Sequence, residues 1–216
     1  MPPSSNPEPS LSALKAQLLA LSASTDAGFE SVEHSGLIAQ IKTLAAAVEA
    51  RTPTPEPLSH LALMDGRWKL LYSSFGLERD TTLRRISFGT LPRDGKIRVS
   101  GVYQMVDHLT GQYDNHVEFT AGAKPNDVAG IHITRGRFMP HAENPIRLAI
   151  TFTGNAALPM EANISEAALR AALGVEADDA LAAPIKFEGW SDVTYLDADT
   201  RLMRGNAGNL YVLTKV

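Results

Sequence analysis

From Arg67 onward the chain is a succession of short segments rich in β-branched and aromatic residues, separated by residues that favour turns. The predicted strands occupy residues 67–74, 82–89, 96–108, 112–121, 128–138, 146–154, 186–197, 201–205 and 209–215. Short connections between neighbouring strands favour antiparallel pairing in sequence order, which gives a meander. A long meander leaves two exposed sheet edges unless it curls and closes on itself. The sequence therefore predicts an up-and-down β-barrel, which is wide enough to hold one small apolar ligand.

Two helices are predicted before the strands, because apolar residues recur there at helical spacing. The first helix begins near Leu11, and Gly28 interrupts the pattern. The second begins near Ser31, with Glu33 in its first turn, where the helix dipole favours a negative charge, and it stops before Pro53. Helices with one apolar face are expected to pack on each other and on the sheet.

The composition of the 216-residue chain narrows the classes of function. Its net charge of −4 argues against a nucleic-acid binder, which needs a basic surface. The chain has no cysteine, so disulfides, thiolate nucleophiles and cysteine-ligated metals are excluded. No apolar run approaches the ~20 residues that span a bilayer, and residues 1–10 resemble neither a signal peptide nor a transit peptide. We therefore expect a cytoplasmic protein of bacterial origin, with no transmembrane segment and at most weak peripheral contact with membranes or lipid bodies.

Two stretches of the chain resemble the PAP/fibrillin family, the plastid-lipid-associated proteins. Residues 66–74, Gly-Arg-Trp-Lys-Leu-Leu-Tyr-Ser-Ser, are similar to the family's opening strand, and residues 195–215 are similar to its final turns and strand. Residues 26–29 and the proline-rich 53–58 are similar to its inter-helix turn and lead-in, so the resemblance covers about residues 11–216. It implies peripheral association with lipid bodies or photosynthetic membranes, and it favours a hollow barrel.

The Gly-Arg-Trp start of the first predicted strand also resembles the start of lipocalin barrels. Trp68 is expected to plug the narrow end of the barrel, and Gly66 to let the chain approach closely. Lipocalins place an arginine from a late strand over the face of that tryptophan. Arg204 is the first candidate for this barrel-closing contact and Arg201 is the second.

The predicted fold class is mainly β with α: a lipocalin-like antiparallel up-and-down β-barrel preceded by a two-helix N-terminal segment. Residues 1–10 are expected to be a disordered N-terminus, 11–60 a helical hairpin with a proline-rich lead-in, and 61–216 the barrel. A helical insertion is expected near 160–175, where a capping-box pattern precedes a short apolar run from Glu166 to Leu173. Because long inserted segments are often functional, we expect this one to lie over a mouth of the barrel.

Alternation along each strand predicts which residues face the barrel interior. The predicted ligand-contacting residues are Leu70, Tyr72, Val99, Tyr103, Met105, Phe119, Arg135 and Phe152. Arg135 follows Ile131 and Ile133 on the same face, so it would bind the head group of a fatty acid or a similar anion if the isoleucines point inward. The alternative is that the strand has reached the rim there and the arginine is solvated.

The sequence contains no nucleophile elbow, phosphate loop, dinucleotide fingerprint or His-Glu-x-x-His helix. His116, Glu118 and His132 lack a fixed third ligand and are expected on the solvated outer face, so we predict no metal, no cofactor and no enzyme activity. The predicted function is non-catalytic binding of a small hydrophobic molecule or lipid inside the barrel. The alternative is a structural protein that coats a lipid or partner surface and has a filled barrel. A third hypothesis, an enzyme with a hydrophobic substrate, requires titratable side chains that converge inside the barrel.

Overall fold

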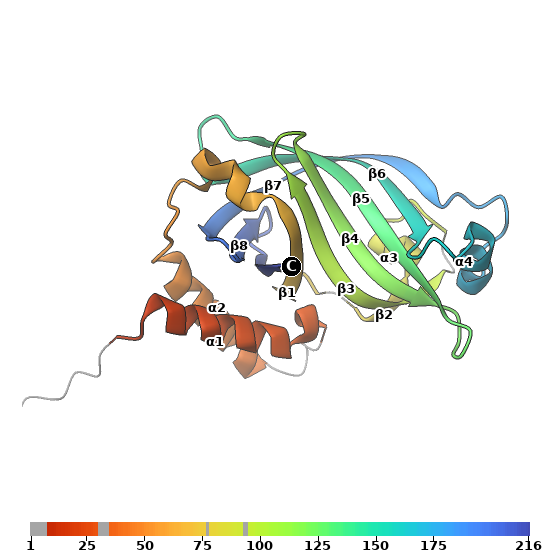
Figure 1. Cartoon of the computed structure of the whole chain (residues 1–216), viewed down its shortest axis with the longest axis horizontal. Helices are drawn as coiled ribbons and strands as arrows, with labels where there is room; N and C mark the ends of the chain where they lie inside the picture. The colour runs from red at the N-terminus through yellow and green to blue at the C-terminus, as the bar shows by residue number, and fades with distance from the viewer. Residues whose placement is uncertain (1–7, 30–34, 77, 93–94) are drawn as a thin grey trace, which may run out of the picture.

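The computed structural model describes residues 8–29, 35–76, 78–92 and 95–216. Its nine strands form one antiparallel sheet in the order β1-β9-β8-β7-β6-β5-β4-β3-β2, and pairing of β1 with β3 closes the ring (Figure 1). The strands are β1 Gly66–Ser73, β2 Asp80–Thr82, β3 Lys96–Asp107, β4 Gln112–Ala121, β5 Val128–Pro140, β6 Arg147–Pro159, β7 Ala182–Leu196, β8 Thr200–Gly205 and β9 Leu210–Lys215. The predicted up-and-down barrel is confirmed.

The two predicted N-terminal helices are α1 (Leu11–Ser24) and α2 (Ser35–Glu49), separated by the short helix η1 (Asp26–Gly28). The predicted start of the second helix at Ser31 and Glu33 lies outside the described residues. Figure 1 shows α1 and α2 side by side against the part of the barrel that contains β1 and β8. Their apolar faces form a core with the outer side of the barrel wall, made of Leu14, Leu18, Ile41, Ala45, Val48, Tyr72, Tyr195, Leu202, Leu210 and Val212.

The predicted strand over 82–89 is wrong. β2 ends at Thr82, and the helix α3 (Leu83–Ile86) follows it. The Thr82 hydroxyl accepts the backbone N–H of Arg85 and so caps the helix, while the Leu83 side chain is fully buried in the barrel. Capping and burial at these positions outweigh the alternation of the segment, which favours a strand.

Helices close both ends of the barrel interior. At one end the helix η3 (Pro57–Met64) places Met64 on a core that contains Trp68, Val106, Tyr113, Leu148 and Leu213. At the other end, α4 (Glu166–Leu173) places Leu169 and Leu173 against Val99 and Phe119. The helix expected from Glu166 to Leu173 is thus α4, and it lies over this mouth of the barrel (Figure 1).

Candidate functional site

Four of the residues predicted to contact a ligand lie on the inner face of the barrel. Leu70 belongs to the core around Trp68, and Phe152 packs against that core. Val99 and Phe119 belong to the core under α3 and α4. Their position agrees with the alternation of their strands, and their contact with a ligand remains a prediction.

Tyr103 and Met105 lie on the outer face, which corrects the prediction. Val99 pairs with Phe119 and Gly101 with Glu118, so Ser100 is an extra residue in β3, a β-bulge. A slip of one residue moves every later side chain to the other face. The residues that alternate with Tyr103 and Met105 therefore face inward, namely Val102, Gln104 and Val106. On the outside, the guanidinium of Arg67 stacks on the Tyr103 ring, 3.8 Å from its centroid.

Tyr72 and Arg135 also face away from the interior. The pairing of β1 with β9 shifts register between Leu70 and Tyr72, so Tyr72 points outward and is buried under the N-terminal helices. On β5 the inward residues are His132 and Thr134, and Arg135 is exposed. The prediction that the isoleucines of β5 point inward is wrong, because Thr134 faces inward and binds a polar partner on β6, while neither ring nitrogen of His132 has a partner among the described residues.

Thr134 and its partner belong to a buried polar cluster. The Thr134 hydroxyl donates to Asn155 Oδ1 at 2.9 Å, and Asn155 Nδ2 donates to the Ser87 carbonyl at 2.9 Å and to the Thr90 hydroxyl at 3.0 Å. His132, expected on the outer face, is fully buried next to this cluster on β5. Burial lowers the pKa of its imidazole to about 4, so the ring is neutral near pH 7. The cluster fixes the segment after α3 to β6 inside the barrel.

Arg201, not Arg204, makes the predicted contact with Trp68. Its guanidinium carbon lies 4.6 Å from the centroid of the Trp68 ring. Arg204 instead points to the outer face, where its Nε and Nη2 donate to Glu49 of α2 at 2.9 and 2.8 Å. Trp68 Nε1 donates to the Met64 carbonyl at 2.7 Å, which ties η3 to the barrel. The φ of Gly66 is 108°, a value that favours glycine. This backbone conformation, rather than the predicted close approach of the chain, explains why the residue is a glycine.

Arg201 is the most deeply buried cation among the described residues. It is 0% exposed, and burial lowers its pKa to about 10, a shift partly opposed by Tyr113. Its Nη2 donates to Gln104 Oε1 at 2.6 Å, whereas Nε and Nη1 have no acceptor within the part of the chain that the structure describes. The barrel interior therefore holds a charged group with unused hydrogen-bond donors.

Beside the first half of β7 the barrel wall has an opening, in the sense that a side chain on its inner face is exposed to solvent there. β8 pairs with Ser191 to Leu196 of β7, and the preceding residues 182–190 extend past it (Figure 1). Phe187 lies in this extension, opposite Phe152 on the inner face, yet it is 53% exposed. Phe88, which follows α3, is 67% exposed and stacks on Phe187 with ring centroids 6.3 Å apart.

A series of aromatic rings connects this opening with the buried centre. Phe187 stacks on Phe152 at a centroid distance of 6.1 Å, and Phe152 contacts the edge of Tyr113 at 6.4 Å. The Tyr113 hydroxyl lies 3.7 Å from the sulfur of Met203, which shares the inner face of β8 with Arg201. Phe152 is among the residues predicted to face inward and Phe187 is not, although its even spacing from the buried Val193 on β7 indicates the same face. Nothing in the sequence shows that β8 stops short and leaves the two rings accessible.

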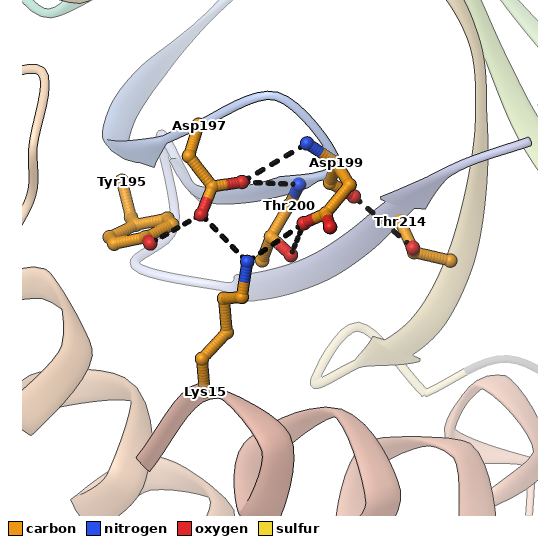
Figure 2. Close-up of polar contacts among 6 residues, drawn as sticks. All are labelled: Lys15, Tyr195, Asp197, Asp199, Thr200 and Thr214. Atoms are coloured by element: carbon orange, nitrogen blue, oxygen red, sulfur yellow. Dashed lines mark hydrogen bonds and ion pairs between the residues drawn. The ribbon is translucent and has the colours of Figure 1, made fainter. Parts of the chain in front are cut away.

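A second polar cluster joins α1 to the turn between β7 and β8 (Figure 2). Lys15 Nζ lies 2.9 Å from both Asp197 Oδ2 and Asp199 Oδ1. The Tyr195 hydroxyl donates to Asp197 Oδ2 at 2.6 Å, and the backbone N–H of Thr200 donates to Asp197 Oδ1 at 2.8 Å. Burial by itself would raise the pKa of Asp197, but these hydrogen bonds outweigh it and lower that pKa to about 2. The cluster ties α1 to the barrel, and each of its polar side chains has a partner within it.

Asp65, Asp107 and His108 form a group whose ligand atoms lie within 4.8 Å of one another. The carboxylates are already used: Asp65 accepts the backbone N–H of His108 at 2.7 Å, and Asp107 accepts that of Leu109 at 2.9 Å. These contacts are typical of a turn that joins two strands. Asp65 follows η3, and its Oδ2 also lies 2.5 Å from His108 Nδ1, so contacts between the end of η3 and the β3–β4 turn account for the group.

Comparison of the sequence with known proteins identifies a family and several plant relatives. The model of the PAP_fibrillin family matches residues 12–214. A plastid-lipid-associated protein from Citrus unshiu is 27% identical over 88% of this chain and 64% of its own length. A light-induced chloroplast protein from Solanum tuberosum is 26% identical, and a chromoplast-specific carotenoid-associated protein from Cucumis sativus is 27% identical, each over 82% of this chain and 60% of the relative. The chain thus spans less than two-thirds of the length of these relatives. No solved structure matches it.

Proposed function

Because this chain belongs to the PAP/fibrillin family, we propose that it associates with lipid and binds a small hydrophobic molecule or lipid inside its barrel, without catalysing a reaction. The relatives carry names that refer to plastid lipid and to carotenoid, both hydrophobic classes. None of the described helices is long and apolar enough to cross a bilayer. The proposed contact with lipid surfaces is accordingly peripheral.

The exposure of Phe187 carries the proposal. A phenylalanine on the inner face of a filled and closed barrel would be buried, whereas Phe187 is 53% exposed and stacked between Phe88 and Phe152. An apolar ligand that covers these rings gains about 25 cal/mol for each Å² of apolar surface removed from water. Aromatic side chains are also suited to binding flat or conjugated chains, because such chains stack on the faces of the rings.

Extraction of the purified protein tests the proposal. The protein is isolated without detergent and extracted with organic solvent, and the extract is analysed by mass spectrometry. We expect the same hydrophobe in every preparation, at a level that falls several-fold in Phe187→Ser. Met139→Ser is the matched control, since Met139 is 69% exposed at the end of β5. Empty extracts, together with a failure to bind a fluorescent fatty acid, would exclude ligand binding in the barrel.

The second candidate function is coating of a lipid or partner surface by the outside of the molecule. A groove of about 630 Å³ between α1 and α2, lined by residues such as Ala20, Leu21, Ala39 and Leu44, favours it. If the protein acts in this way, Leu21→Asp should abolish its flotation with lipid vesicles. The barrel proposal instead expects Leu21→Asp to retain its hydrophobe.

A further inference from the structure

The guanidinium of Arg201 lacks the counter-charge that a buried cation needs. Removing a charge from water is strongly unfavourable unless an opposite charge or a full set of hydrogen bonds replaces the solvent. Arg201 has one such bond, from Nη2 to Gln104, and Nε and Nη1 have no acceptor among the described residues. The group that partly offsets the effect of burial on its pKa is the phenol of Tyr113 rather than a carboxylate.

The aromatic series leads from solvent to this cation. Phe88 and Phe187 stand at the opening, Phe152 stacks on Phe187, and Tyr113 follows at the buried end. Tyr113 reaches Met203, two residues along the inner face of β8 from Arg201. Tyr113 and Arg201 are 2% and 0% exposed, so a molecule that follows the rings inward must displace the core side chains around Tyr113 to bring its inner end to the unused donors.

We propose that Arg201 binds the anionic head group of the ligand, and that the ligand is an amphiphile with a carboxylate or phosphate monoester at one end and an apolar chain along Tyr113, Phe152 and Phe187. This inference rests on the proposed function and specifies the class of ligand. The unused N–H groups of Arg201 donate charge-assisted hydrogen bonds to the head group. Its cation–π contact with the Trp68 ring holds the guanidinium in place before the ligand arrives.

Competition binding tests the inference. The delipidated protein is loaded with a fluorescent fatty acid, which is displaced by oleate, oleyl phosphate or oleyl alcohol below their critical micelle concentrations. We expect either anion or both to bind at least about tenfold more tightly than the alcohol, as a charge-assisted hydrogen bond implies. The ratio of oleate to oleyl phosphate identifies the head group. Arg201→Gln should abolish the preference, whereas Arg135→Gln, on the exposed outer face, should keep it.

A second variant covers the case in which Arg201→Gln does not fold. Gln104→Glu places a carboxylate beside Nη2 of Arg201, so this variant supplies the missing charge and should lose the preference for anions while still binding oleyl alcohol. Equal affinity of the unmodified protein for alcohol and anions would overturn the inference and leave the proposed function intact. A preference that persists in either folded variant would also overturn it. Failure of all three compounds to bind, with empty extracts, would overturn the proposed function itself.

Discussion

Asp197 links α1 to the barrel through the ammonium of Lys15 and the hydroxyl of Tyr195. We expect Asp197→Asn to lower the free energy of unfolding at pH 7 by about 2 kcal/mol, because hydrogen bonds to a charged group contribute about 1.5–3 kcal/mol. Urea denaturation measures the loss. Asp199→Asn is the control: its carboxylate is 65% exposed, so the loss should stay below about 1 kcal/mol. An equal loss in the two variants would contradict this ranking.

The same carboxylate predicts an acid-dependent loss of stability. The pKa of Asp197 is lowered to about 2 in the folded protein, whereas an unfolded aspartate titrates near 4. Its contribution is therefore fully present above about pH 4 and is lost as the pH falls towards 2. Thermal unfolding between pH 5 and pH 2 should show the difference between the unmodified protein and Asp197→Asn shrinking with acidity. A difference that does not change with pH would mean that Asp197 acts through packing alone.

Gly130 is a glycine because two side chains occupy the space of its missing Cβ. A Cβ there would lie 2.5 Å from Phe119 Cζ and 3.1 Å from Leu169 Cδ1, under α4. We expect Gly130→Ala to lower the melting temperature and to cost about 1–3 kcal/mol of stability, as overpacking of a core does. In Gly189→Ala, the control on β7, the nearest neighbour of the new methyl is the Phe187 ring at 3.5 Å, so little change is expected. Equal stability of the two variants would show that α4 can shift to make room for the methyl group at little cost in free energy.

The type and order of the elements could be predicted from the sequence, because their signals are local. Residues 112–121 are β4 as predicted, and the helix before Gly174 is α4, with the Gly174 φ of 65° that its cap requires. The prediction of a strand over 82–89 is wrong, because the apolar pattern of this segment is also compatible with the short strand and one-turn helix that the structure has there. Burial inside the barrel decides between them, and no local signal reports it.

The inner face could be predicted only as far as the first irregularity of each strand. Leu70 and Val99 precede their bulges and face inward as predicted, whereas Tyr72, Tyr103 and Met105 follow bulges and do not. The prediction for Arg135 is wrong for another reason. The isoleucines of β5 face outward because Thr134 faces inward and forms a hydrogen bond with Asn155 inside the barrel. Bulges and buried polar pairs depend on strands distant in sequence, so alternation within one strand cannot reveal them.

The bulge at Ser100 sets the face of the second half of β3, which predicts the effect of removing it. Deletion of Ser100 would turn Tyr103 inward and Val102 outward while β4 keeps its register. We expect this variant to lose cooperative thermal unfolding or to be insoluble. Deletion of Ala142, in the exposed turn between β5 and β6, is the control and should be tolerated. A stable variant lacking Ser100 would mean that β3 can move its bulge elsewhere.

At the scale of the whole molecule, the described structure is a barrel closed by η3 at one end and by α3 and α4 at the other, with an opening in its side. The opening exists because β8 is shorter than β7, and the segment after α3 crosses it with Phe88. α1 and α2 cover a different part of the wall, the outer face of β1, β8 and β9. The surface on which these helices pack is thus separate from the opening that leads to the interior.

This arrangement predicts that joining Phe88 to Phe187 blocks ligand exchange. The chain has no cysteine, so Phe88→Cys/Phe187→Cys introduces two unique thiols at the opening, where the native rings lie 6.3 Å apart. After reaction with a short bismaleimide, release of a bound fluorescent fatty acid should slow by at least about tenfold, because the ligand leaves between these positions. Each single-cysteine variant treated in the same way controls for the label and should release at its untreated rate. Unchanged release from the cross-linked protein would place the route through α4 or η3 instead, and cross-links at those helices would then slow it.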